Sequence, residues 1–163
     1  MGTLRSYLPK LQGSIPFAYM ECRSLPGDGR WVYIPWRNLR RFLDDICPED
    51  WGCQFSDPVY LEPQGQYLEA DQKAICTVRC VLAICGVKRE ALGSAPIQLI
   101  SRNGRDATQG DPVERACADA FRSACELFGI GCYLQRQAKD SGWQNELIRR
   151  MNAAKEDGMA GAA

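Results

Sequence analysis

The side chains of this chain best suited to binding a ligand are arginines and aromatic rings that lie close together in the sequence. Trp31, Tyr33 and Trp36 stand among several arginines. Arginine neutralises phosphates and aromatic rings stack on bases, so this combination is typical of a surface that binds a single-stranded nucleic acid. The alternative is that the rings belong to the hydrophobic core, and we favour that alternative for Trp36 and Trp51.

The residue types that carry out covalent catalysis are missing or incomplete. There is no histidine to serve as the base for a serine or cysteine nucleophile, and there is no G-x-x-x-x-G-K-[ST] phosphate-binding loop. The acidic pairs at 44–45 and 49–50 could hold Mg²⁺, but acidic neighbours at a helix end are far more often solvated. We therefore expect no catalytic residue, no cofactor and no metal site.

Cysteine is unusually frequent, with nine residues at irregular spacings and no C-x-x-C pair. We interpret these cysteines as reduced, buried, small hydrophobic side chains of a cytosolic protein. A disulfide framework and a thiol-dependent redox or metal protein are the alternatives, and both lack the usual paired spacing.

The charges of the chain cancel overall but are segregated along it. Residues 1–41 sum to +5, residues 42–71 to −8, residues 72–110 to +4 and residues 111–163 to −1, and fifteen of the twenty basic side chains are arginine. Such a chain can present a basic groove or pair head to tail with its own copy, although solvated faces are the simpler explanation. No apolar run has the length of a membrane span or of a secretory signal, so we expect a cytoplasmic protein without a membrane partner.

One helix, predicted to begin after Asp111, organises the chain. Asp111 is a suitable N-cap, Pro112 suits the first helical position, and Gly129 predicts the stop. Arg122 is the one positive charge in the middle of this helix. Small residues recur every four positions and would let a second backbone, from the sheet or from a neighbouring subunit, come close: Ala116, Ala120 and Ala124.

The hydrophobic pattern around this helix predicts an α+β domain, in which an antiparallel sheet of a hairpin plus three to four strands packs on the long central helix. We expect the domain to span residues 1–140, followed by an amphipathic helix at 141–154 capped by Ser141 and a disordered tail at 155–163. The other expected elements are a helix near 4–11, strands at 17–23 and 30–34, a helix opened by Pro35, strands at 51–61, 74–84 and 87–92, and an irregular connection at 93–110.

The central helix resembles the signature helix of the Rad52 superfamily of single-strand annealing proteins, which includes the Sak-type phage and DdrA-type bacterial proteins. The resemblance rests on the run DPVERACADAFRSACELFGIGCYL, in which Asp119, Arg122, Phe128 and Gly129 occupy the pattern's positions. Two weaker matches are in the expected order: YIPWRNLRRFLDDICPEDWGCQF and TVRCVLAICGVKREALGS. Together the three stretches cover roughly residues 20–135.

This resemblance implies an oligomeric ring that binds single-stranded DNA and anneals complementary strands in recombination and repair without ATP. It implies basic groups on the helix and around the first hairpin turn, at Arg122, Arg23 and Tyr33. Where the family often has a second basic residue on the helix and a lysine near the second hairpin turn, this chain has Ser123 and Gln66, which favours either weaker DNA binding or a different DNA footprint. The full set of predicted DNA-binding residues is Arg23, Arg30, Tyr33, Arg37, Arg41, Lys88, Arg102, Arg105 and Arg122.

Two other functions remain open from the sequence: a single-stranded nucleic-acid-binding protein without annealing activity, and an oligomeric scaffold. Candidate partners are single-stranded DNA, further copies of the chain, and an exonuclease or single-strand-binding protein. The predicted location is the nucleoid within the cytoplasm.

Overall fold

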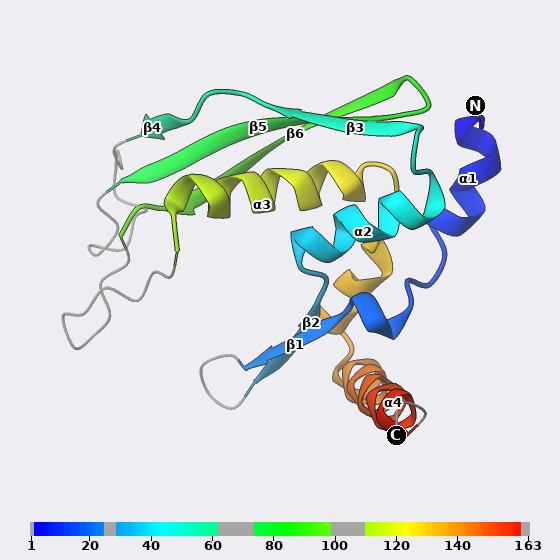
Figure 1. The fold of residues 1–163 in the computed structure, drawn as a ribbon. Coiled ribbons are helices and arrows are strands. Elements are labelled where there is room, and N and C mark those ends of the chain that lie inside the picture. The colour runs from blue at the N-terminus through cyan, green and yellow to red at the C-terminus, as the bar shows by residue number, and fades with distance from the viewer. Residues whose placement is uncertain (1, 25–28, 62–73, 99–109, 161–163) are drawn as a thin grey trace.

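The computed structural model describes residues 2–24, 29–61, 74–98 and 110–160, with side-chain surroundings as far as residue 155 (Figure 1). The elements in chain order are α1 (Leu4–Leu11), the 3-10 helix η1 (Phe17–Tyr19), β1 (Glu21–Ser24), β2 (Arg30–Tyr33), α2 (Trp36–Ile46), β3 (Trp51–Phe55), β4 (Val59–Leu61), β5 (Ile75–Ile84), β6 (Val87–Pro96), α3 (Pro112–Glu126), the 3-10 helix η2 (Cys132–Ala138) and α4 (Ser141–Ala160). This order confirms the predicted α+β class.

Two antiparallel sheets contain all the described strands. β1 pairs with β2 in a short hairpin, and β5 is the central strand of the second sheet. β3 and β4 pair with successive parts of one edge of β5, and β6 pairs with its other edge over ten residues. Alternate side chains of β5, from Cys76 to Ile84, are buried, as expected for a strand with one covered face.

The strand predicted at 51–61 is broken into β3 and β4. Pro58 has no N–H for the ladder, so the pairing cannot run through unchanged. Ser56 bridges the gap, because its N–H donates to the Arg79 carbonyl and its hydroxyl accepts from the Arg79 N–H. The break also places Phe55 and Val59 on different faces of the sheet, because Phe55 lies opposite Cys80 whereas Val59 lies opposite Thr77.

Two other predicted boundaries need correction. The strand predicted at 17–23 begins later than expected. Residues 17–19 form a 3-10 turn after Pro16, and the residues that pair with β2 are 21–24. β6 continues to Pro96, so the segment from Gly93 to Pro96 belongs to the sheet and not to an irregular connection. Residues 99–109 lie outside the described residues.

α3 begins as the sequence predicts. The Asp111 carboxylate accepts hydrogen bonds from the N–H groups of Val113 and Glu114, and Pro112 occupies the first turn. The helix ends at Glu126, and Gly129 then takes the left-handed conformation, with φ of +85°. Its local start and stop signals therefore suffice to define this helix.

The small-residue face of α3 packs directly on the sheet. Ala116, Ala120 and Ala124 are fully buried. Gly93 of β6 lies so close to this face that a Cβ on it would fall 2.0 Å from the Ala120 nitrogen and 2.5 Å from the Ala116 carbonyl oxygen. Of the two backbones considered for the alanine stripe, the sheet is therefore the one that contacts it.

α4 begins at the predicted residue, Ser141, but its capping residue and its end differ from the prediction. Asp140, not Ser141, caps the helix, since its carboxylate accepts from the Trp143 N–H at 2.9 Å. This hydrogen bond and the neighbouring Arg136 hold the pKa of Asp140 below its usual range. The helix continues to Ala160, so the interval predicted as a disordered tail begins inside it. The predicted apolar face is correct: Leu147, Ile148 and Met151 are buried and Trp143 is half-buried.

The second sheet has one covered face and one open face. Figure 1 shows α3 along one face and no helix drawn over the other. On the open face, Arg79 pairs with Glu90 at 3.2 Å and Leu92 is 66% exposed. Within the described ranges, none of the helices combines the length and apolar character needed to cross a bilayer.

Candidate nucleic-acid interface

Arg122 projects from the third turn of α3 with its direction fixed by its own helix. Its Nε donates to the Ala118 carbonyl at 3.3 Å, and its Nη2 lies 3.5 Å from Asp119 Oδ1. The other Asp119 oxygen accepts from the Ser94 N–H of β6 at 3.1 Å. Asp119 thus holds the edge of the sheet and orients Arg122 at the same time.

The β1–β2 hairpin presents one polar and aromatic face. Because alternate residues share a face, Trp31 and Tyr33 lie with Arg23 and Glu21, their partners across the ladder. The Tyr33 hydroxyl donates to Glu21 Oε2 at 3.0 Å, and the Arg23 guanidinium carbon lies 5.5 Å from the centre of the Tyr33 ring. Burial and the Glu21 carboxylate raise the pKa of Tyr33, so its hydroxyl stays neutral and bears no charge that would repel a phosphate.

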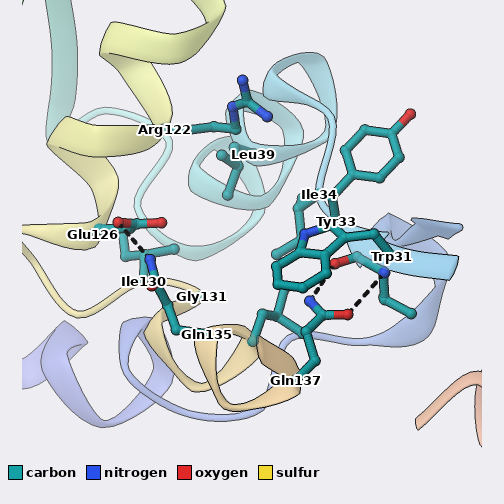
Figure 2. Close-up of a pocket in the computed structure, with 12 residues that line it drawn as sticks. Trp31, Tyr33, Ile34, Leu39, Arg122, Glu126, Ile130, Gly131, Gln135 and Gln137 are labelled. Carbon is teal, nitrogen blue, oxygen red and sulfur yellow. Dashed lines mark hydrogen bonds between the residues drawn. The ribbon is translucent and has the colours of Figure 1, made fainter. Parts of the chain in front are cut away.

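A pocket of about 170 Å³, here named the Arg122 hollow, lies between this hairpin and α3. Figure 2 shows Arg122 on one side of it, Trp31 and Tyr33 on another, and Glu126 and Gln135 along the α3–η2 side. Leu39 of α2 and the main chain between α3 and η2 contribute apolar walls. The left-handed φ of +74° at Gly131 turns the chain from α3 into η2, which closes this side of the hollow.

Gln137 attaches the hairpin to η2. Its side chain is buried, with Oε1 accepting from the Val32 N–H at 3.0 Å and Nε2 donating to the Val32 carbonyl at 2.7 Å (Figure 2). One amide therefore satisfies both backbone groups of a buried residue on the free edge of β2, and this fixes the aromatic face of β2 beside α3.

Replacing Gln137 with leucine should lower the free energy of unfolding by about 2–6 kcal/mol, because two buried backbone groups would lose their partners at about 1–3 kcal/mol each. Urea denaturation followed by circular dichroism measures this loss. Gln54→Leu, at an exposed position of β3, is the matched control and should change stability little. Equal stability of Gln137→Leu and the wild type would show that the hydrogen bonds between Gln137 and Val32 contribute nothing to the free energy of unfolding.

The structure brings five of the predicted DNA-binding residues to this side of the molecule. Arg122 and Tyr33 line the hollow, and Arg23 lies over the Tyr33 ring. Arg37 is exposed in the first turn of α2. It lies close enough to Tyr33 for its positive charge to offset part of the rise in the pKa of that residue. Arg41 lies one turn further along α2 with its guanidinium over the Tyr19 ring, 5.8 Å from its centre. Their contacts with DNA stay a prediction.

The other predicted residues are not part of this group. Arg30 is on the opposite face of the hairpin, beside Gln144 and Arg149 of α4. Lys88 is exposed on β6 opposite Ala83, on the open face of the sheet. The remaining two predicted residues, and the position where a family lysine is replaced, lie outside the described residues: Arg102, Arg105 and Gln66.

The tryptophans divide between core and hollow. Trp36 and Trp51 each pack against the buried Phe121 ring, at 6.4 and 6.1 Å between ring centres, which confirms their assignment to the core. Trp31, which the sequence places with Tyr33 among the rings suited to base stacking but which is not in the set of predicted DNA-binding residues, lines the hollow instead. Its two-residue spacing from Tyr33 was the signal that could have placed it there.

Glu126 and Gln135 also line the hollow and were not predicted. Glu126 follows Arg122 by four residues, so helical periodicity could have placed both on one side of α3. Gln135 belongs to η2, a 3-10 helix that is not among the elements predicted from the sequence.

In the part of the chain that the structure describes, the cysteines form neither a disulfide framework nor a metal site. All nine are free thiols in the structure. Burial raises the pKa of Cys80 to about 12, and burial raises that of Cys47 to about 11, so both are protonated near neutral pH. Among the described residues, no group of three or more histidine, cysteine, aspartate or glutamate side chains is arranged to hold a metal ion.

Comparison with known proteins identifies the family of this chain. Residues 3–153 match the model of the Rad52/22 family of double-strand break repair proteins, and the chain belongs to this family. A relative is the mitochondrial DNA repair RAD52-like protein 1 of Arabidopsis thaliana, which is 28% identical over 139 residues, covering 82% of this chain and 68% of the relative. The superfamily is thereby confirmed, whereas the Sak- or DdrA-like, phage or bacterial type stays a prediction.

Proposed function

We propose that this protein binds single-stranded DNA across the Arg122 hollow and anneals complementary strands without ATP, as an oligomeric ring acting in recombination and repair. The observation that supports this most is the set of arginines around the hollow. Arg23, Arg37 and Arg41 form no ion pair with any described residue, and they lie beside half-buried aromatic rings in a chain of the Rad52/22 family. Such arginines are free to take phosphates as partners.

Annealing requires the protein to position the DNA backbone and requires no covalent chemistry. Arginines that hold the phosphate backbone release counterions, so affinity should fall as salt rises. A strand held mainly by its backbone leaves most base edges accessible to a second strand. The acidic groups interleaved with these arginines, such as Glu21 and Asp119, weaken the positive potential and favour modest affinity, as Ser123 also does.

Ring formation needs an interface between two different surfaces of neighbouring copies. The candidates are the acidic segment 42–71 and the basic segment 1–41, which carry charges of −8 and +5. Light scattering at low and high salt tests this proposal, and a monomer under both conditions would contradict it. An exonuclease or single-strand-binding partner and a nucleoid location are further parts of the proposal.

The proposed activity is tested by mixing complementary fluorescent oligonucleotides with the protein in the presence of EDTA and without nucleotide. We expect pairing at least about tenfold faster than without protein, since concentrating both strands on one assembly raises their effective concentration. Non-complementary oligonucleotides are the control. Binding without acceleration would instead identify a plain single-strand-binding protein, and absence of binding would leave the scaffold function.

A further inference from the structure

The interior of the Arg122 hollow differs in charge from its surroundings. Glu126 lines it, one helical turn beyond Arg122, and Gln135 Nε2 donates to Glu126 Oε2 at 3.1 Å (Figure 2). Among the described residues nothing donates to the other carboxylate oxygen of Glu126. Arg122 and Glu126 both line the hollow, so their charges offset each other, and a phosphate that reached the carboxylate would lose much of the attraction of Arg122. The group that suits the interior is therefore uncharged and brings a hydrogen-bond donor.

The hollow is open to solvent on one side, and its size suits a group of about one ring. Its volume of about 170 Å³ is close to that of an engineered cavity of about 150 Å³ that accommodates benzene. A single six-membered ring fits such a volume, whereas the fused rings of a purine need more. The comparison favours a pyrimidine among the groups that a bound DNA strand can offer.

The walls of the hollow suit a flat ring. Trp31 and Tyr33 lie along one side (Figure 2). Trp36, Trp51 and Trp143 pack against other aromatic rings, but Trp31 has no such partner among the described residues. An aromatic face without a protein ring beside it can stack on a base at about 1–3 kcal/mol.

We infer that the Arg122 hollow is a subsite for one pyrimidine base of the bound strand and selects cytosine through Glu126. The cytosine N4 amino group donates to a carboxylate, whereas uracil and thymine present an O4 acceptor at the same place. The N3–H of uracil and thymine is flanked by O2 and O4, and a carboxylate that approached it would be repelled by both oxygens. The inference rests on the proposed function, because phosphate contacts at Arg122 and its neighbouring arginines are what bring a base to the hollow.

This subsite has a consequence for annealing. A cytosine whose N4 amino group is bound to Glu126 has part of its pairing edge occupied, so it must leave the hollow before it can pair with guanine. The other bases of the strand need no such release. The subsite therefore makes single-strand affinity depend on base composition in a protein whose remaining contacts are to phosphates.

The test compares oligo(dC) with oligo(dU) of equal length by fluorescence anisotropy at a pH slightly above neutral. The two bases have rings of the same size and differ at position 4, amino against carbonyl, and at N3, acceptor against N–H donor, so stacking and phosphate contacts are closely matched while the hydrogen-bonding edge is changed. We expect oligo(dC) to bind about tenfold more tightly, the effect of one hydrogen bond to a charged acceptor.

Glu126→Gln keeps the shape of the side chain, and its amide can accept from N4 or donate to O4, so the ratio of the two affinities should fall to about one. Loss of a negative charge raises affinity for both oligonucleotides alike, and the ratio removes that effect. Glu49→Gln, an exposed glutamate beyond the end of α2, is the matched control and should keep the wild-type ratio.

Equal binding of both oligonucleotides by the wild type would overturn the subsite and leave the proposed function standing. A preference that survives Glu126→Gln would overturn the assignment to Glu126. Absence of binding to either oligonucleotide would overturn the proposed function itself.

Discussion

Replacing Gly93 with alanine should destabilise this protein by about 3 kcal/mol or more, a large part of the stability of an ordinary domain. The new Cβ would lie 2.0 Å from the backbone nitrogen of Ala120 and 2.5 Å from the carbonyl oxygen of Ala116. Both obstacles are main-chain atoms of a capped helix, so no side chain can turn aside. α3 would have to move away from β6, and the Asp119 hydrogen bond to Ser94 would be stretched with it.

Thermal and urea denaturation of Gly93→Ala measure this loss. Gly52→Ala is the matched control, because Gly52 lies in β3 of the same sheet and a Cβ there meets no atom within 4 Å. The control should be as stable as the wild type or slightly more stable, since alanine restricts the unfolded chain. If Gly93→Ala proved as stable as the control, the close contact between β6 and α3 would be contradicted.

Replacing Arg122 with alanine should weaken binding of single-stranded DNA by about tenfold, because a charge-assisted hydrogen bond to a phosphate contributes about 1.5–3 kcal/mol. The slope of log affinity against log salt should also become shallower by about 0.7, the value for one phosphate contact on a single strand. The side chain is only half-buried, so we expect the fold to remain intact. Fluorescence anisotropy across a salt series measures both quantities.

The control for this variant is Arg79→Ala. Arg79 is an exposed arginine in an ion pair with Glu90, as Arg122 is with Asp119, but it lies on the open face of the sheet. Its removal takes away the same charge and should leave affinity within about twofold of the wild type, because exposed charges beyond about 10 Å are largely screened at 0.1 M salt. Equal losses for the two variants would mean that only net charge matters.

The parts of the fold that could be predicted from the sequence are those fixed by neighbouring residues. Asp111, Pro112 and Gly129 define α3 without reference to any distant contact, and the alternation from Cys76 to Ile84 defines β5. In both cases the signals that decide the element lie within a few residues of it.

Gly93 shows why the rest could not be predicted. A glycine followed by serine and, two residues later, by a proline is typical of a loop, yet here it continues β6. Its missing side chain is required by Ala116 and Ala120, which follow it by more than twenty residues and meet it only in the folded chain. The interruption at Pro58 is the opposite case, since the local signal was present in the sequence and was overlooked.

The candidate site likewise has one part that could be predicted from neighbouring residues and one part that could not. Arg122 could be predicted, as a lone charge on an apolar helix and as a position of the family motif. The hollow beside it could not, because its walls come from β2, α2, α3 and η2, and their meeting depends on the tether from Gln137 to Val32 across 105 positions of the chain. Only Tyr33 and Arg122 of its lining residues were among the predicted DNA contacts.

The central claim is that single-stranded DNA passes across the Arg122 hollow, and photo-crosslinking tests it most directly. An oligonucleotide carrying 5-iododeoxyuridine is irradiated with the protein, and the crosslinked tryptic peptides are identified by mass spectrometry. The proposed path predicts crosslinks in the peptide from Trp31 to Arg37, which carries two aromatic rings beside or near the hollow. Crosslinks confined to other peptides, such as the one with the exposed Tyr60 of β4, would contradict it.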